Sequence, residues 1–110
     1  MKLFIAGSRN ITDFDFEPHI PENTTEIICG GAKGIEALAE KYADKKNLSK
    51  RILRPEYNKY GRNAPLVRNA EMAGICDEAL IIWDGKSKGT LHSIGELIKA
   101  EKPYKVVLIK

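Results

Sequence analysis

The chain has 110 residues, of which 43% are hydrophobic and 30% are charged, and its formal net charge is +3. This length predicts one domain, residues 1–110, with a single core, and the composition excludes the disordered and collagen-like classes. No apolar run is long enough to span a bilayer, and the first residues do not resemble a secretory signal. We therefore expect no membrane association and a cytoplasmic location.

Cysteine usage and charge narrow the function classes further. Cys29 and Cys76 are too few and too far apart for a disulfide framework or a metal site, so we expect two buried thiols and no bound metal. The small excess of basic residues is compatible with an anionic ligand. It lacks the dense basic stripe of a dedicated nucleic-acid-binding protein, so nucleic acid is not an expected partner.

The first half of the chain predicts three strands and one helix. Leu3–Ala6 and Glu26–Cys29 are short aliphatic runs typical of strands, and two prolines in the segment 10–23 between them limit any helix there to a short one. Gly34–Asn47 spaces its apolar residues along one face and predicts an amphipathic helix. Arg51–Leu53 predicts the third strand.

The second half continues this alternation. Pro65–Ile75 predicts a helix with proline in its first turn, where a missing N–H is harmless, and Ala79–Trp83 predicts a buried strand. A third helix is expected over Gly89–Glu101, ended by a proline, and a fifth strand over Lys105–Ile109. The residues that this third helix is expected to bury are Leu91, Ile94, Leu97 and Ile98.

Strands that alternate with helices predict an α/β fold, here a single Rossmann-like domain with a five-stranded, mostly parallel sheet and helices on both faces. Most of the strands lack strict alternation, which is typical of strands covered on both faces. We assume the strand order 3-2-1-4-5, in which the order reverses between the first and fourth strands. Open sheets of this kind bind ligands in the crevice at that reversal.

Three glycine-rich segments follow predicted strands: AGSRN at 6–10, CGGAKGIE at 29–36 and WDGKSKGT at 83–90. In the assumed order they converge at the reversal. Glycines let backbone N–H groups approach an anion, and two of the segments lead into helix N-termini, which attract negative charge. The sequence therefore predicts phosphate binding, with these candidate residues: Gly7, Ser8, Arg9, Gly30, Gly31, Lys33, Gly34, Asp84, Gly85, Ser87, Gly89 and Thr90.

Other roles stay open for several of these residues. The glycines of 29–36 serve equally for close packing of helix against strand, and Thr90 suits a helix N-cap. Lys86 and Lys88 are either ligand contacts or solvated side chains. Asp84 either accepts hydrogen bonds from a ribose or caps the turn. The Walker A and dinucleotide-binding glycine patterns are both absent, which argues against a standard nucleotide triphosphatase or NAD dehydrogenase.

The segment YGRNAPLVRNAEM at 60–72 carries a further candidate. Arg68 and Met72 lie four residues apart on one face of the predicted helix, with Asn69 adjacent. An arginine near a helix N-terminus opposes the helix dipole, which favours a functional role for Arg68, with Asn69 beside it, in holding a phosphate or a ribose hydroxyl. The aromatic side chains that are candidates for stacking on a base are Tyr57, Tyr60 and Trp83.

Taken together, the motifs IAGSR (5–9), GGAKGIEALAEKYA (30–43), APLVRNAEM (64–72) and CDEALIIWDGKSKGT (76–90) resemble the SLOG superfamily, and within it the small YspA-related branch. The resemblance covers nearly the whole chain. It implies a Rossmann-like domain that binds a nucleotide or a nucleotide-derived ligand such as NAD or ADP-ribose, without a required cofactor. LOG-like relatives pair through helices, which makes a homodimer an expectation.

The resemblance extends more distantly to the LOG phosphoribohydrolases, whose helix with arginine and methionine matches Arg68 and Met72 and whose glycine–threonine pair matches Gly89 and Thr90. Ser93 stands where that family has its catalytic glutamate, which puts the hydrolysis in doubt. Cleavage of a glycosidic bond needs a carboxylate. The candidate catalytic residues are Arg68 and Glu36; Glu96 and the neighbouring His92 are weaker ones.

The sequence thus leaves three functions to distinguish, and whether the chain is an enzyme stays open. The first is a binding or sensing domain for a nucleotide-like small molecule. The second is an N-glycosidic hydrolase that uses a carboxylate other than the family's. The third, expected least because of the modest charge, is single-stranded DNA binding like that of the related DNA-processing protein A.

Overall fold

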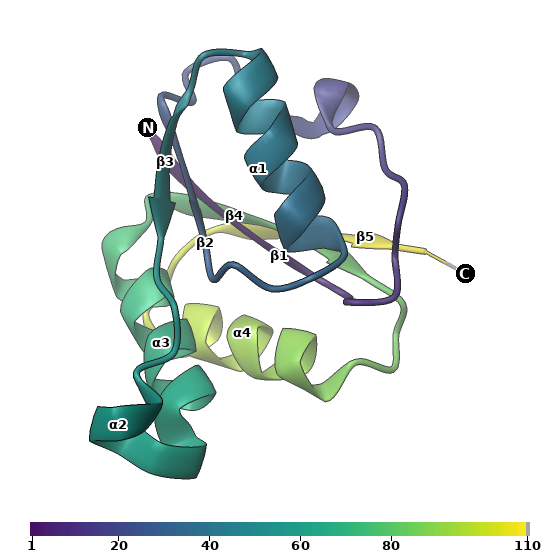
Figure 1. Cartoon of the computed structure of the whole chain (residues 1–110). Helices are drawn as coiled ribbons and strands as arrows, with labels where there is room; N and C mark the ends of the chain where they lie inside the picture. The colour runs from purple at the N-terminus through teal and green to yellow at the C-terminus, as the bar shows by residue number, and fades with distance from the viewer. Residues whose placement is uncertain (110) are drawn as a thin grey trace.

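The sheet of the computed structural model, which describes residues 1–109, contains five strands that all run parallel (Figure 1). Their order is β3-β2-β1-β4-β5, which confirms the predicted α/β class and the assumed order. The third strand begins two residues earlier than predicted. The strands are β1 (Lys2–Gly7), β2 (Glu26–Cys29), β3 (Ser49–Ile52), β4 (Glu78–Trp83) and β5 (Tyr104–Leu108).

The helices include the three that the sequence predicts, a short one in the segment 10–23 where it allowed one, and short ones directly before Ala64 that it does not predict. The three are α1 (Ile35–Lys45), α3 (Ala64–Ile75) and α4 (Lys88–Lys99). A four-residue helix α2 (Tyr57–Tyr60) and the 3-10 turn η2 (Gly61–Asn63) lead into α3, and a second 3-10 turn, η1, forms at Glu17–His19. Within residues 1–109, no helix combines the length and the apolar character that crossing a bilayer requires.

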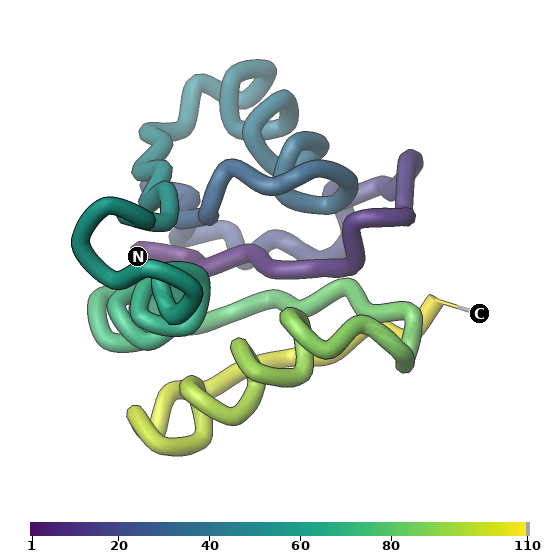
Figure 2. Tube along the Cα trace, turned by 60° about the horizontal axis from the view of Figure 1, so that its bottom comes forward, coloured from purple at the N-terminus to yellow at the C-terminus, as the bar shows by residue number. Residues whose placement is uncertain are grey.

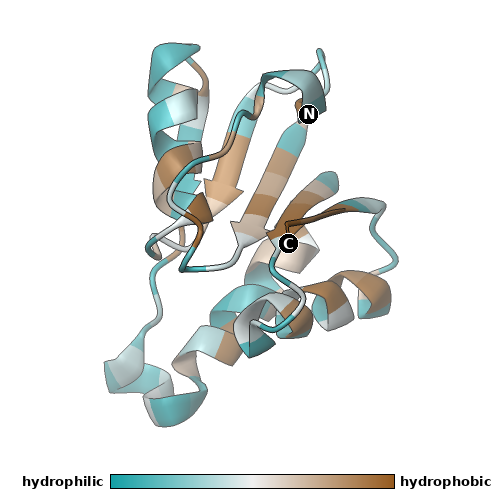
Figure 3. Cartoon of the chain, turned by 90° about the vertical axis from the view of Figure 1, so that its right-hand side faces the viewer, coloured by the Kyte–Doolittle hydropathy of each residue, from teal (hydrophilic) through white to brown (hydrophobic). Residues whose placement is uncertain are grey.

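The sheet separates two hydrophobic clusters because successive side chains of a strand point to opposite faces. Leu3 and Ile5 of β1 pack with α1 on one face, whereas Phe4 and Ala6 pack with α3 and α4 on the other. Figures 1 and 2 show the sheet between these two layers, and in Figure 3 the hydrophobic colours concentrate on its strands. Burial on both faces explains why the strands lack sequence alternation.

Both cysteines lie in the core, as predicted. Cys29 and Cys76 are free thiols and are buried. Burial raises the pKa of the Cys29 thiol to about 12. The thiolate is the reactive form of cysteine, so Cys29 serves as a small core side chain.

The N-terminus of α1 is fixed against the end of β1 by a glycine. Gly34, the N-cap of α1, has φ of +73°, and a Cβ placed on it would lie 2.5 Å from the carbonyl oxygen of Ser8 and 2.6 Å from that of Arg9. A side chain is therefore excluded by both backbone conformation and space. Gly34 holds the second glycine segment directly over the first and is a packing residue.

The buried face of α4 differs from the one predicted. Leu97 is buried as expected, but Leu91 and Ile98 are 54% and 58% exposed. The neighbouring edge strand β5 explains the difference, because α4 packs on β1 and β4 and leaves one face of β5 uncovered.

The predicted homodimer stays a prediction. Exposed apolar side chains of β5 are Tyr104, Val106 and Leu108.

The strand order reverses between β1 and β4, whose ends pair through Gly7 and Ile82. Because all strands are parallel, the segments that follow β1, β2 and β4 leave the same edge of the sheet. This is the position at which open α/β sheets form their ligand crevice.

Candidate functional site

A cavity of about 420 Å³ opens at this edge of the sheet. Its wall is built by the segments after β1, β2 and β3, by α3 and by the start of α4, so the convergence expected of the glycine-rich segments is present. The sequence-predicted residues that line it are Gly7, Arg9, Gly30, Gly31, Glu36, Tyr57, Arg68, Asn69, Ser87, Gly89 and Thr90.

Gly30 stands between two charged side chains of the wall. Arg68 Nη1 donates a hydrogen bond to the Gly30 carbonyl oxygen at 3.1 Å, and the Gly30 N–H donates to the Glu36 carboxylate. A Cβ on Gly30 would lie 2.7 Å from Arg68 Nη1 and 2.9 Å from Glu36 Oε1. Only glycine leaves room for both contacts, so Gly30 positions the arginine and the glutamate together.

Arg68 retains an unused donor. Its Nε is buried and has no hydrogen-bond partner within residues 1–109. Buried donors in proteins nearly always have an acceptor, and leaving one without costs about 1–3 kcal/mol. Arg68 also lines the cavity, and a guanidinium in a cavity wall binds anionic groups such as carboxylate and phosphate.

Glu36 is the one carboxylate on this wall among the described residues, and it is 8% exposed. Burial raises the pKa of its carboxyl group, while the Gly30 N–H and the Arg68 guanidinium act in the opposite direction. The net shift is upward. The folded protein therefore binds the Glu36 proton more tightly than the unfolded chain does.

This shift predicts a pH-dependent stability term that Glu36→Gln removes. Because the folded pKa lies above the unfolded one, stability falls as pH rises from the ordinary value of 4.5 through the raised pKa. Glutamine is always neutral and still accepts the Gly30 N–H bond. Urea unfolding of both proteins between pH 4 and 8 measures this. The free energy of unfolding of the variant should increase relative to that of the wild type as pH rises. Parallel curves would contradict the assignment.

Positive charge dominates the rest of the wall. Arg9 and Arg54 line the cavity with Arg68, and Arg54 Nη1 donates to the Gly31 carbonyl oxygen at 3.4 Å. Arg54 was not among the candidates from sequence. Its signal was present, because it directly follows the predicted third strand and therefore leaves the sheet at the same edge as the glycine-rich segments.

The turn before α4 is held by Asp84 and Ser8. Asp84 Oδ1 accepts hydrogen bonds from the N–H groups of Lys86 and Ser87, both at 2.8 Å, and these bonds lower the pKa of the Asp84 carboxyl. The Asp84 N–H donates to Ser8 Oγ at 2.9 Å. Asp84 thus caps the turn and Ser8 ties it to β1, and neither side chain lines the cavity.

The N-terminus of α4 reaches the cavity without a side-chain cap. Ser87 is its N-cap and makes no capping hydrogen bond to the backbone of the helix. Thr90 is the third residue of α4, so the alternative that it caps the helix is wrong; its hydroxyl lies 3.2 Å from Ser87 Oγ. The first N–H groups of an α-helix have no partner within it, so this end offers donors to an anion.

Several predicted ligand contacts lie outside the wall. The remaining glycines serve the backbone: Gly34 packs on β1, and Gly85 adopts a φ of +80° in the turn. Lys33 is exposed and does not line the cavity, and the same holds for Lys86 and Lys88. Long surface lysines extend toward water, which their position in the sequence does not reveal.

The mouth of the cavity is apolar. Tyr57 of α2 and Leu66 of α3 line it and are 60% and 44% exposed, with Pro55 and Pro65 beside them. Of the three aromatic candidates, only Tyr57 belongs to this wall. Trp83 instead donates its Nε1–H to the Ser87 carbonyl oxygen at 3.0 Å and packs against the core.

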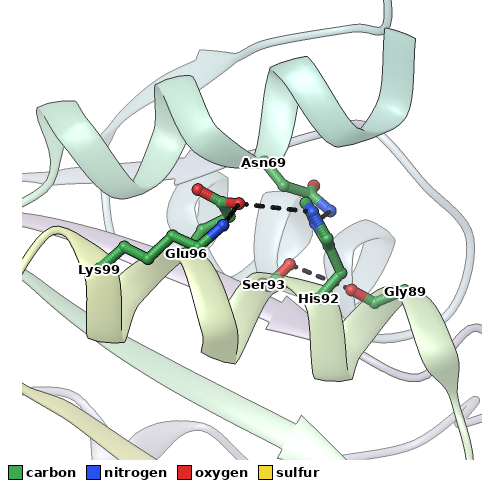
Figure 4. A network of polar contacts seen from close by, with 6 residues as sticks. All are labelled: Asn69, Gly89, His92, Ser93, Glu96 and Lys99. Atoms are coloured by element: carbon green, nitrogen blue, oxygen red, sulfur yellow. Dashed lines mark hydrogen bonds and ion pairs between the residues drawn. The ribbon is translucent and has the colours of Figure 1, made fainter. Parts of the chain in front are cut away.

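The helix α4 also carries Ser93, which the sequence resemblance predicts to stand where the LOG phosphoribohydrolases have a glutamate. Ser93 lines the cavity, and its hydroxyl donates to the Gly89 carbonyl oxygen at 3.3 Å (Figure 4). Glu96 lies outside the wall, within 3.5 Å of His92 Nε2 and 3.3 Å of Lys99 Nζ. Glu96 therefore does not supply a carboxylate to the cavity.

No family model, curated protein or solved structure matches the chain. Within residues 1–109, no three His, Cys, Asp or Glu side chains gather into a group that could hold a metal ion.

Proposed function

We propose that the chain binds a nucleotide or a nucleotide-derived small molecule, of the nucleoside phosphate or ADP-ribose kind, in the cavity at the reversal of strand order. The observation that carries this proposal is the half-buried Arg68 side chain, whose guanidinium lines the cavity together with Arg9 and Arg54. A phosphate is the anion whose geometry best matches a guanidinium.

Two further groups support an anionic ligand. Arg9 and Arg54 bring positive charge to the same wall, against the single carboxylate of Glu36 within residues 1–109. The uncapped N-terminus of α4, with Ser87 and Thr90, adds backbone and hydroxyl donors. The lining thus offers binding groups for two phosphates, or for a phosphate and a ribose.

The apolar mouth supports an aromatic part of the ligand. Tyr57 and Leu66 expose apolar surface beside the cavity, and such a surface stacks on the planar face of a base. A cavity of about 420 Å³ lies within the ordinary range for small-molecule sites. The charged and polar lining suits the phosphate and ribose of a nucleotide, and the apolar side chains of Tyr57 and Leu66 suit its base.

A thermal-shift panel tests the proposal. The ligands are AMP, ADP, ATP, NAD, ADP-ribose and cyclic nucleotides, with adenosine as the phosphate-free control. A ligand at about 100 times its Kd stabilises the folded state by about 2.7 kcal/mol, which raises the Tm of a domain of this size by several degrees. We expect at least one phosphate-bearing ligand to do so and adenosine not to. An equal response to adenosine, or no response to any ligand, would contradict the proposal.

Glu36 supports a second candidate, an N-glycosidic hydrolase on the same site. In that reaction the Glu36 carboxylate accepts a proton from water as the water oxygen bonds to C1′, and the base leaves with the electron pair of the C1′–N bond. The supporting observation is a buried carboxylate on the wall, with a pKa that burial raises above its ordinary value. Free adenine appearing in AMP incubations, and its loss in Glu36→Gln, would favour the hydrolase. Binding without release would favour the binding domain.

A further inference from the structure

One polar side chain of the wall is oriented by contacts that lie outside the cavity. Asn69 of α3, which is 5% exposed, lines the cavity, and its Nδ2 lies 3.1 Å from Nδ1 of His92 on α4. His92 Nε2 in turn lies 3.5 Å from Glu96 Oε1, as Figure 4 shows. A row of contacts therefore runs from Glu96 through His92 to the wall.

The contact with Glu96 favours the tautomer of His92 that carries its hydrogen on Nε2. An ionised carboxylate only accepts hydrogen bonds, so the Nε2 that faces it carries the hydrogen, and Nδ1 of the neutral ring is then an acceptor. Lys99 Nζ lies 3.3 Å from the same carboxylate oxygen and supplies the opposite charge. His92 therefore presents a lone pair to Asn69.

A neutral His92 fixes the orientation of the Asn69 carboxamide. The lone pair on Nδ1 requires the NH2 group on that side, which leaves Oδ1 as the polar atom that Asn69 offers to the cavity. The arginines Arg9, Arg54 and Arg68 of the same wall are donors only. Asn69 is thus an acceptor placed on a wall rich in donors.

We propose that Asn69 Oδ1 accepts a hydrogen bond from a donor group of the bound nucleotide, and that His92, held by Glu96, is the positioning residue that keeps Asn69 in this orientation. This inference rests on the proposed nucleotide-binding function. The donor is an amino group of the base or a ribose hydroxyl, which share this chemistry. Oxo groups and phosphate oxygens, which only accept, are disfavoured beside Asn69.

Protonation of His92 reverses the arrangement. With hydrogen on both ring nitrogens, Nδ1 no longer accepts, and the carboxamide turns over to place Oδ1 toward His92 and NH2 toward the cavity. The charged groups on the side of α4 that carries His92 are Glu96, Lys99 and the exposed Lys88 one turn earlier; α3 contributes the uncharged Asn69.

NMR of the ligand-free protein tests the positioning directly. We expect the His92 ring to show the Nε2–H form at pH 8, and the side-chain amide signals of Asn69 to move with the same midpoint as the ring when pH is lowered to 5. His92→Phe should abolish that movement. His19→Asn, which changes the other histidine of the chain on η1, should leave it intact. If the Asn69 side-chain amide signals do not shift when the His92 ring signals do, the inference is overturned.

Affinity measurements test the effect on the ligand. At pH 8 we expect AMP to bind about 2- to 10-fold more tightly than either IMP, which has an oxo group for the amino group, or 2′-deoxy-AMP, which lacks a hydroxyl. The pair that shows the difference identifies the donor. The ratio of the Kd of the analogue to the Kd of AMP should fall toward one in His92→Phe, and also in the wild type at pH 5.5. The preference for AMP should persist at pH 5.5 in His92→Asn, which keeps an acceptor near the Nδ1 position and does not titrate.

The two kinds of failure are distinguishable. If the Asn69 signals follow His92 but no nucleotide binds, the proposed function is wrong and the positioning role of His92 stands. If nucleotides bind, but neither protonation nor substitution of His92 changes the Asn69 signals or the preference for AMP, the inference is wrong and the proposed function stands.

Discussion

Replacing Arg68 with alanine is expected to weaken the binding of AMP or ADP-ribose by about 10- to 150-fold, because a hydrogen bond to a charged group contributes about 1.5–3 kcal/mol. The Arg68 side chain donates to the Gly30 carbonyl oxygen and carries the buried Nε that has no partner within residues 1–109. Its removal takes a positive charge and a guanidinium from the wall. Isothermal titration calorimetry below the melting temperature measures the loss.

A matched arginine controls for net charge. Arg62 of η2 is exposed and does not line the cavity. Arg62→Ala removes the same charge from the chain and should change the affinity by less than about twofold, since an exposed charge is screened at physiological salt. If the two variants lose affinity equally, attraction by the whole protein explains the binding, and the specific role of Arg68 is wrong.

The largest expected effect on stability is that of Gly34→Ala. Alanine at this position adopts a φ of +73° and places its Cβ 2.5 Å from the Ser8 carbonyl oxygen. Backbone strain and overpacking together are expected to lower the free energy of unfolding by about 2–4 kcal/mol. Urea unfolding measures this change, and ligand binding should suffer as well because Gly34 holds the two glycine segments together.

Gly95→Ala is the comparison for this variant. Gly95 lies inside α4, and a Cβ on it would meet nothing within 4 Å. Alanine favours the helix by about 0.5–1 kcal/mol relative to glycine, so this variant is expected to be more stable than the wild type. The same substitution should therefore act with opposite signs at the two positions. A loss of stability at both positions would contradict the account of Gly34.

The sheet could be predicted because local and global patterns agree. Runs such as Glu26–Cys29 and Ala79–Trp83 are aliphatic on both faces, and the sheet does bury both. The helix α2 could not be predicted because its four residues are too few to show a helical period. The exposed side of α4 depends on how far that helix extends over β5, which is a tertiary property.

The candidate site was predicted in its backbone more reliably than in its side chains. Gly30 and Gly31 line the cavity because strand ends and parallel topology determine where the backbone goes. Ser8 was assigned to the ligand, and Asp84 either to the ligand or to the turn; both bond to the turn, since a short polar side chain satisfies the nearest backbone group first. Arg54 could not be predicted from glycine-rich segments, because the strand that it follows ends without a glycine.

The central claim is that a phosphate-bearing nucleotide occupies the cavity at the reversal of strand order. The most direct test is a titration of the 15N-labelled protein with AMP, followed by two-dimensional NMR, with adenosine as the control. The account predicts that the largest shifts from AMP fall on the backbone amides of Gly30, Gly31, Gly89 and Thr90, and that adenosine leaves these amides nearly unchanged. Shifts confined to the exposed face of β5, or no shifts at any concentration, would contradict it.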